Sequence, residues 1–369
     1  MPSHSLTTPA RRHRLAVRAL CLAGALACSG FSASTSRAQS PAASDTATLP
    51  AGLRERAEQV GSGEWAVDAI LTMPAASAPV PGIVLMHGSG PGTKDGEIGP
   101  NRVYREMAWA LAARGVAVLR YDKRPTAHQA RFQARGRAPT MDEEHVDDAV
   151  AAARLLQRTP GVDAHRVYVL GLSQSTAVAA DVAARVASAG EAPVAGLVLV
   201  SASARRPAEM ILDQTEYGAR VARQNGDSAR LREALWAHGE AERMQRADLP
   251  DSVLALGMPL AYWRAMDPRR TWAETARFLD AGGRVLVVSG ARDFQTTASD
   301  HAGWQRALAR YPAASFRRYP ALNHLMQPGV GKMTPAEFEQ PMRVSPEFLD
   351  DVARWIGQTD PEKDDRGGR

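Results

Sequence analysis

The stretch Val167–Ala177 constrains the fold of this chain more than any other. Its first four residues are apolar and mostly β-favouring, Gly171 ends the run, and an alanine-rich helical pattern follows. A strand, a Gly-x-Ser turn and a helix form the layout of a nucleophile elbow, which would lift Ser173 Oγ clear of a sheet. The usual motif has glycine where this chain has Ser175. The alternative is that Ser173 is only a helix N-cap.

Strand and helix patterns alternate along the chain with short connections. Buried strands are expected at 83–86, 116–119, 167–170, 196–201, 284–289 and 315–319, and helices at 104–114, 140–156, 298–311 and 346–356. Thr140 and Glu143 have the spacing of a capping box. An earlier run, 64–73, is expected to form an antiparallel strand. The alternation predicts a doubly wound, mostly parallel α/β sheet with helices on both faces.

The alternation pauses between residues 205 and 279, where strand signals are few and large apolar residues are scattered. We expect a helical cap inserted between two core segments, 64–204 and 280–357; the alternative is that these apolar residues simply cover the sheet. Residues 39–63 are rich in Ala, Ser, Thr and Pro and are expected to form a linker. The charged segment 358–369 is expected to be a disordered tail.

The first 38 residues have the pattern of a secretory signal peptide. Four arginines between positions 11 and 18 precede an apolar run at 19–27, and no acidic residue occurs before Asp45. Ser36 and Ala38 offer small residues for cleavage after Ala38, and the apolar run is too short to span a membrane. We therefore expect an exported protein, periplasmic or secreted. A lipoprotein variant through Cys28 and twin-arginine export through Arg11-Arg12 remain alternatives.

Removal of that segment changes what the charge implies. The formal net charge of +5 comes from the five arginines within it, and the remaining basic and acidic residues balance at 40 each. Nothing in this balance favours a nucleic-acid or polyanion partner. Both cysteines, Cys21 and Cys28, also lie in the segment. A processed chain would therefore have no disulfide, thiolate metal site or cysteine nucleophile.

Three residues at strand ends have the identities and order of a serine-hydrolase triad. Ser173 follows one expected strand, Asp293 follows the next but one, and His324 follows the last. Serine hydrolysis needs a nucleophile, a base and an acid that orients the base, in this chain order on a parallel sheet. Asp300 is the alternative acid, and Asp293 could instead be a turn-forming residue.

The loop after the strand at 83–86 reads His87-Gly88-Ser89-Gly90. Its glycines would let backbone N–H groups face a substrate, so we expect the N–H groups of Ser89 and Gln174 to hold an oxyanion, with His87 bracing the loop. A phosphate-cradling loop is the weaker alternative, since no P-loop or dinucleotide fingerprint is present. No metal or cofactor is expected. The acidic stretch 142–148 with His145 is interpreted as a solvated helix face.

Several of these segments together resemble a known group, the exported bacterial α/β-hydrolase esterases related to the dienelactone-hydrolase and acyl-thioesterase-like branches. The resemblance covers roughly residues 64–356 and is carried by Leu85-Met86-His87-Gly88-Ser89-Gly90-Pro91, Val118-Leu119-Arg120-Tyr121-Asp122-Lys123-Arg124, the elbow, Gly290-Ala291-Arg292-Asp293 and Leu322-Asn323-His324-Leu325. It implies hydrolysis of small-molecule carboxylic esters through an acyl-enzyme without a cofactor. Leu172, which flanks the elbow serine, and Trp263 and Met266 in the cap segment are expected to line the substrate pocket.

Other activities are compatible with the same pattern. A prolyl-oligopeptidase-like peptidase would usually need a large propeller, which residues 39–63 cannot hold. A thioesterase or a carbon–carbon bond hydrolase would share the triad and the glycine-rich loop. A non-catalytic binding scaffold is disfavoured because all three triad positions are filled.

Overall fold

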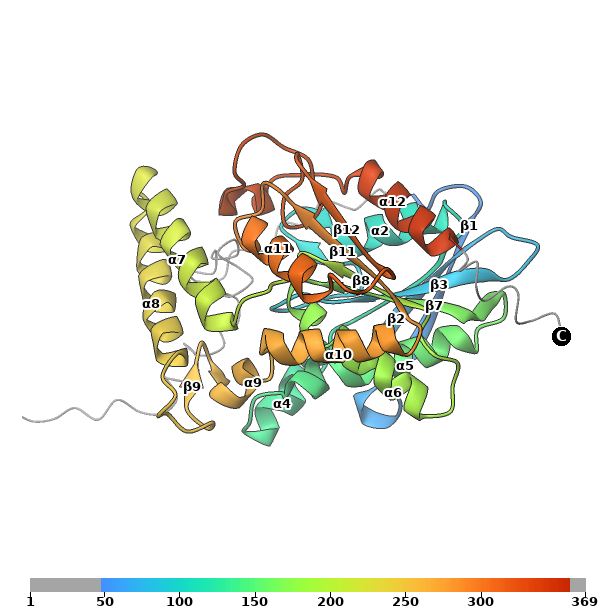
Figure 1. The fold of residues 1–369 in the computed structure, drawn as a ribbon, viewed down its shortest axis with the longest axis horizontal. Coiled ribbons are helices and arrows are strands. Elements are labelled where there is room, and N and C mark those ends of the chain that lie inside the picture. The colour runs from blue at the N-terminus through green and yellow to red at the C-terminus, as the bar shows by residue number, and fades with distance from the viewer. Residues whose placement is uncertain (1–47, 359–369) are drawn as a thin grey trace, which may run out of the picture.

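A mixed sheet of eight strands organises the computed structural model, which describes residues 48–358 (Figure 1). The strands lie in the order β1-β2-β6-β3-β7-β8-β11-β12. Their bounds are β1 Leu53–Val60, β2 Val67–Pro74, β3 Val80–Met86, β6 Ala117–Tyr121, β7 Val162–Leu172, β8 Gly196–Val200, β11 Arg284–Gly290 and β12 Ala314–Tyr319. From β6 to β12 every neighbouring pair is parallel, whereas β2 pairs antiparallel with both β1 and β6. The expected mostly parallel, doubly wound sheet is confirmed.

The edge strand β1 overturns part of the expected linker. Residues 53–60 lie inside the segment 39–63, yet each of them pairs with a residue of β2. The strand is an edge strand with mostly exposed charged side chains, so neither apolar alternation nor an apolar run marks it in the sequence. A 3-10 turn, η1 Gly63–Trp65, then delays the start of β2 from the expected residue 64 to Val67.

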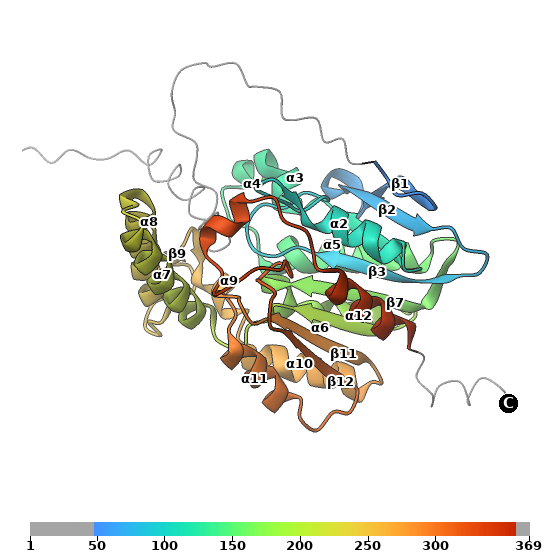
Figure 2. The same ribbon diagram turned by 90° about the horizontal axis from the view of Figure 1, so that it is seen from above.

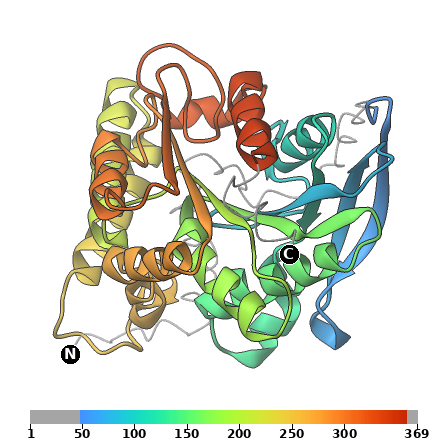
Figure 3. The ribbon, with the colours of Figure 1, turned by 45° about the vertical axis from the view of Figure 1, so that its right-hand side comes forward.

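Helices cover both faces of the sheet, which explains why central strands such as β3 and β8 are unbroken apolar runs. In β3, Ile83 and Leu85 point toward one face while Val84 and Met86 point toward the other, and all four are buried. Figure 3 shows the C-terminal helix, red, on one side and the green helices on the other. The first face carries α2 Val103–Ala112 and α12 Pro346–Gly357; the second carries α5 Asp147–Gln157, α6 Ala179–Ser188, α10 Pro268–Asp280 and α11 Ala298–Ala307.

The segment expected to be a cap forms a helical hairpin at one end of the sheet (Figure 2). Helix α7 Pro207–Gln224 begins with proline at its first position, and α8 Ser228–Met244 is capped by the Asp227 carboxylate. The chain returns through short strands β9 Leu254–Ala255 and β10 Met258–Pro259 and helix α9 Leu260–Arg264. The last helix, α10, lies against the sheet beside α6, where Arg270 pairs with Asp181. Both alternatives therefore hold, each for part of the segment.

The remaining elements are short. They are β4 Glu97–Ile98, β5 Asn101–Arg102, α3 Arg124–Ala127, α4 Gln129–Arg135, the π-helical turn η2 Asp142–Val146, and the 3-10 turns η3 Ser173–Ala177 and η4 Pro335–Glu339. The predicted capping box is present, because Thr140 and Glu143 exchange side chain-to-backbone hydrogen bonds of 3.0 and 3.2 Å.

Within residues 48–358, no helix is both long and apolar enough to cross a membrane. The expected signal peptide at 1–38, the first part of the linker and nearly all of the expected tail lie outside the described residues.

Candidate active site

The turn after β7 places Ser173 in a conformation that few serines adopt. Its φ is +54°, in the left-handed region, and it is the first residue of η3 rather than the residue that caps it. Ser173 is therefore not a helix N-cap. A strained serine between a strand and a helical turn is the geometry expected of a nucleophile elbow.

The elbow is tight because Gly171 has no side chain. A Cβ at that position would lie 3.1 Å from the backbone nitrogen of Thr176. Ser175, which replaces the usual glycine, is fully buried, and its hydroxyl accepts a 3.0 Å bond from Leu172 N–H. The same hydroxyl lies 3.1 Å from the Leu172 carbonyl oxygen, so it pins the helical turn back onto the strand.

The loops after β11 and β12 bring Asp293 and His324 together. His324 Nδ1 lies 2.6 Å from Asp293 Oδ2, and both side chains are buried. Asp293 also accepts bonds from Gln295 N–H at 2.7 Å and from the Thr296 hydroxyl at 2.6 Å. The carboxylate is thus held on three sides and fixes the orientation of the imidazole ring.

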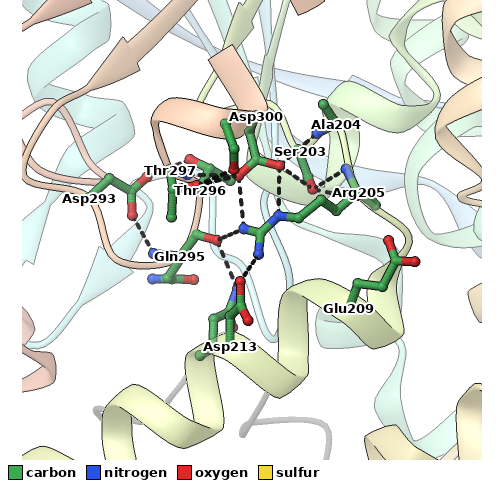
Figure 4. A network of polar contacts seen from close by, with 12 residues as sticks. Ser203, Ala204, Arg205, Glu209, Asp213, Asp293, Gln295, Thr296, Thr297 and Asp300 are labelled. Carbon is green, nitrogen blue, oxygen red and sulfur yellow. Dashed lines mark hydrogen bonds and ion pairs between the residues drawn. The ribbon is translucent and has the colours of Figure 1, made fainter. Parts of the chain in front are cut away.

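The alternative acid, Asp300, has a different set of partners (Figure 4). It binds the guanidinium of Arg205 at 2.8 and 3.0 Å and accepts the Ala204 N–H at 2.9 Å. Arg205 reaches across to Asp213 and the Gln295 carbonyl as well, so this cluster ties the start of the cap segment to the loop after β11. Asp300 serves that junction, and only Asp293 bonds to His324.

The backbone around His324 is shaped by its neighbours. Asn323 Oδ1 accepts the N–H groups of Leu325 and Gln327, both at 3.0 Å. The Ser201 hydroxyl donates to the His324 carbonyl at 2.8 Å, and Ser201 itself has a φ of +52° at the end of β8. These hydrogen bonds hold the backbone of the loop without involving the imidazole ring, so the position of the His324 side chain is fixed by an ordered loop.

Ser173 and His324 line one cavity of about 190 Å³, together with the loop His87–Gly92. A second cavity of about 50 Å³ also opens on Ser173 and lies under the cap segment, lined by Trp263 and Met266. Leu172 lines the first cavity and not the second. Within residues 48–358, the Ser173 side chain has no hydrogen-bond partner; such contacts are often long without a ligand.

The glycine-rich loop passes directly over the elbow. A Cβ on Gly88 would lie 3.6 Å from Ser173 Cβ. The Gly88 N–H donates to the Tyr104 hydroxyl at 3.1 Å, whereas the N–H of Ser89 has no acceptor in the described part of the chain. Ser89 lines both cavities, and Gln174 N–H lies in the first turn of η3, where donors lack intrahelical acceptors. Two N–H groups therefore flank Ser173.

His87 braces this loop from behind. Its Nε2 lies 2.5 Å from the Tyr121 carbonyl oxygen, and its ring packs edge-on against Tyr104 and Tyr121. Burial, together with the charge of Lys123, lowers the pKa of His87 to about 4. The ring is therefore neutral at pH 7 and donates its Nε2 proton to the carbonyl.

The interpretation of residues 142–148 as a solvated helix face is wrong for Glu144 and His145, and also for Asp148, which is buried and pairs with Arg124. Glu144 and His145 are buried, and Glu144 Oε1 lies 2.5 Å from Nζ of the buried Lys123. Burial lowers the pKa of Lys123, while the attraction of Glu144 opposes that shift. Burial would raise the pKa of Glu144, but Lys123 and His145 outweigh it and the pKa falls. The two groups form a buried ion pair.

A chain of hydrogen bonds links this pair to the elbow. Tyr262 of α9 donates to Glu144 Oε2 at 2.9 Å and accepts a 2.9 Å bond from Gln174 Nε2. His145 Nε2 lies 3.3 Å from Gln174 Oε1. Burial and the Lys123 charge lower the pKa of His145 to about 3, so it too is neutral and donates.

Lys123, Glu144, His145 and Tyr262 are the residues of the site that sequence reasoning missed. Lys123 lies directly after a buried strand, in the segment Tyr121-Asp122-Lys123-Arg124 that contributes to the family resemblance. Its position at the end of a parallel strand, beside the expected site, was the one sign in the sequence that it belongs to the site. Within residues 48–358, no group of three or more His, Cys, Asp or Glu side chains is placed to hold a metal ion.

Comparison with known proteins agrees with this fold. Esterase EstD of Thermotoga maritima is 32% identical over 289 residues, which are 78% of this chain and 64% of that protein. The chain thus spans less than two thirds of the length of this relative.

Solved structures of similar fold include Est1E from Butyrivibrio proteoclasticus, with 16% identity, 82% of this chain and 99% of that chain covered, and a TM-score of 0.51. A bacterial heroin esterase has 17% identity, 85% and 86% coverage, and a TM-score of 0.52. At these identities the likeness shows the fold alone. Residues 83–331 match the alpha/beta hydrolase family, and the chain belongs to that family.

Proposed function

We propose that this protein is a serine esterase that cleaves small-molecule carboxylic esters through an acyl-enzyme. One observation carries the proposal: a serine at positive φ shares a cavity with a histidine whose other ring nitrogen is bound to a buried carboxylate. The 32% identity to a protein named as an esterase supports the same reaction class.

In this mechanism Ser173 attacks the ester carbonyl while His324 Nε2 takes its proton. The N–H groups of Ser89 and Gln174 hold the oxyanion, and Asp293 stabilises the imidazolium that forms. His324 then gives its proton to the leaving alcohol. Water, activated by the same histidine, attacks the acyl-enzyme and releases the acid.

The two cavities support a separate place for each half of the ester. His324 must reach the leaving oxygen, and it lines the larger cavity but not the smaller one. The alcohol half would therefore extend along the loop His87–Gly92, and the acyl half would enter the cavity under Trp263 and Met266. That cavity of about 50 Å³ holds only a few atoms, because one water needs about 10–15 Å³. We propose short acyl chains.

The test is labelling with a fluorophosphonate, which reports an activated serine. The protein lacking residues 1–38 should gain one adduct, and Ser173→Ala should gain none. Absence of labelling in both would refute the proposal. Hydrolysis of aryl esters of increasing acyl length would then be compared with cleavage of a vinylogous diketone. Preference for the diketone would replace the esterase proposal with carbon–carbon bond hydrolysis.

We also propose that residues 1–38 direct export, with cleavage after Ala38. Expression of the full chain in a bacterium, followed by N-terminal mass analysis of the periplasmic fraction, tests this. An uncut chain confined to the cytoplasm would refute it.

A further inference from the structure

We propose that Lys123 is a positioning residue of the oxyanion hole: it fixes and polarises the peptide group whose N–H belongs to Ser89. The proposal rests on the proposed esterase function. It assigns a role to a residue that does not line either cavity at Ser173.

All three N–H groups of the Lys123 ammonium bind acceptors inside the protein. Nζ donates to the Gly88 carbonyl at 2.8 Å and to the Gly90 carbonyl at 2.9 Å, and it meets Glu144 Oε1 at 2.5 Å. Only 1% of the side chain is exposed. A lysine has three donors and no acceptor, so its hydrogen-bonding capacity is filled by one glutamate and the two carbonyls of the loop.

The Gly88 carbonyl and the Ser89 N–H belong to the same peptide plane. In a trans peptide these two groups point in opposite directions. Holding the carbonyl toward Lys123 therefore directs the Ser89 N–H away from it, and this N–H has no acceptor within residues 48–358. Glycines on both sides of Ser89 would otherwise leave this peptide free to rotate. The lysine supplies the restraint that the sequence of the loop lacks.

The charge adds to the geometry. A cation bound to a peptide carbonyl draws electron density from the amide and makes its N–H a stronger donor, and the effect grows where the surroundings are dry. The developing negative charge of the transition state would benefit from this more than the neutral ester does. We therefore expect Lys123 to act mainly on kcat rather than on KM.

The choice of lysine is informative in this chain. Of its 45 basic residues only four are lysines. A guanidinium is a wide planar fork, whereas an ammonium is a compact point charge that can meet three acceptors converging from different directions. The Lys123 site has such acceptors, which is why arginine, used elsewhere throughout the chain, would fit it poorly.

Glu144 connects this restraint to the other half of the oxyanion hole. Its second oxygen accepts from Tyr262, which in turn accepts from the side chain of Gln174. Gln174 supplies the second expected N–H donor. One buried network, Lys123–Glu144–Tyr262–Gln174, thus joins the loop over the elbow, the helix of the elbow and helix α9.

The experiment replaces Lys123 with methionine, which is also unbranched, is one atom shorter and has no N–H donors. We expect kcat for a short-chain aryl ester to fall 10²–10³-fold, the range for loss of one oxyanion donor, with KM nearly unchanged. Affinity for an aryl trifluoromethyl ketone, which forms an oxyanion on Ser173, should fall by a similar factor. Binding of the unreactive alcohol analogue should not change. Lys94→Met is the matched control, because Lys94 pairs with Asp122 and is 30% exposed.

Lys123→Met removes the cation that pairs with the buried Glu144 carboxylate, so this variant could fail to fold. A second pair of variants keeps the proposal testable in that case. Glu144→Gln keeps Lys123 and its two carbonyl bonds, and the double variant K123M/E144Q removes both charges together. The double variant should lose at least tenfold more kcat than Glu144→Gln.

Two results would overturn the inference. One is a folded Lys123→Met or double variant with kcat like that of its parent. The other is an equal loss of affinity for the trifluoromethyl ketone and the alcohol analogue, which indicates a structural role alone. An unlabelled, inactive parent protein would instead refute the esterase proposal and the inference with it.

Discussion

Replacement of Asp293 by asparagine gives the most direct test of the acid assignment. Asp293 Oδ2 accepts the His324 Nδ1 proton at 2.6 Å, which leaves Nε2 as the basic nitrogen of a residue that lines the cavity. An asparagine can turn its NH2 group toward Nδ1 and so stabilise the opposite tautomer, with the proton on Nε2. A histidine in that tautomer cannot take the proton from Ser173.

The expected loss follows from this change of tautomer. Comparable loss of the orienting carboxylate lowers kcat by about 10⁴ in serine proteases. The Gln295 N–H binds Oδ1, so the amide oxygen can keep that contact. The Thr296 hydroxyl, which donates to Oδ2, can rotate and accept from the NH2 group instead, so the fold should survive. We expect a native circular dichroism spectrum, a similar urea midpoint and hydrolysis of an aryl ester reduced by about 10⁴.

Asp300→Asn is the matched control in the neighbouring network. Asp300 is 1% exposed and pairs with Arg205, so its neutralisation removes one of the two carboxylates that this guanidinium meets and leaves the other, Asp213. The cost should fall on stability, by about 1–3 kcal/mol, with a far smaller loss of kcat below the unfolding temperature. If Asp293→Asn keeps substantial activity, or if Asp300→Asn loses kcat to the same extent while folded, the assignment of the acid is wrong.

Three further predictions concern the pocket, the buried histidines and the elbow. Met266→Ala should enlarge the smaller cavity, so the ratio of rates for a longer to a shorter acyl chain should rise; an unchanged ratio would remove that cavity from acyl binding. His87 and His145 have pKa values lowered to about 4 and about 3 in the folded protein. Below pH 6.5 the unfolded chain therefore binds more protons at these histidines than the folded protein does. The free energy of unfolding should be at its full value above pH 6.5 and should decline as the pH falls below it. Between pH 7 and 5 the loss should be about 2 kcal/mol per histidine in urea unfolding, and His145→Gln should remove about half of the combined loss; a flat profile would contradict the burial argument. Gly171→Ala places a Cβ 3.1 Å from the backbone nitrogen of Thr176. This close contact should slow fluorophosphonate labelling of Ser173 and lower the free energy of unfolding by about 1–3 kcal/mol. Labelling at the parent rate would show that the elbow tolerates a side chain at this position.

The sheet and the order of the candidate triad were predictable because their signals are local. Most of the parallel strands are apolar runs, and Asp293 follows one of them, β11. His324 follows β12, in which Phe316 and Tyr319 flank two exposed arginines. Strand β1 was not predicted because an exposed edge strand needs no apolar pattern. Its residues are held by backbone pairing with β2, and the sequence gives no sign of that pairing.

The buried Lys123–Glu144 ion pair was not predicted from the sequence, for a different reason. Charged residues are expected at the surface unless a specific partner is known, and Tyr262, which completes the network, lies 118 positions from Glu144. Three acidic residues before His145 favour a solvated helix turn on composition alone. Only the tertiary structure, which places Lys123 and Tyr262 beside η2, turns Glu144 inward.

The two ends of the sheet bear on how copies of this protein meet. An edge strand exposes unpaired backbone groups that can add a strand from another molecule. Strand β1 carries Arg54, Glu55 and Arg56 on its exposed positions, and the opposite edge, β12, carries Arg317 and Arg318. Adding a copy of β12 along its own edge would bring arginines together, and adding a copy of β1 would force charged side chains of both signs into the new strand pair. The sheet is thereby protected from growing by strand addition, and the protein can be concentrated without that route to aggregation.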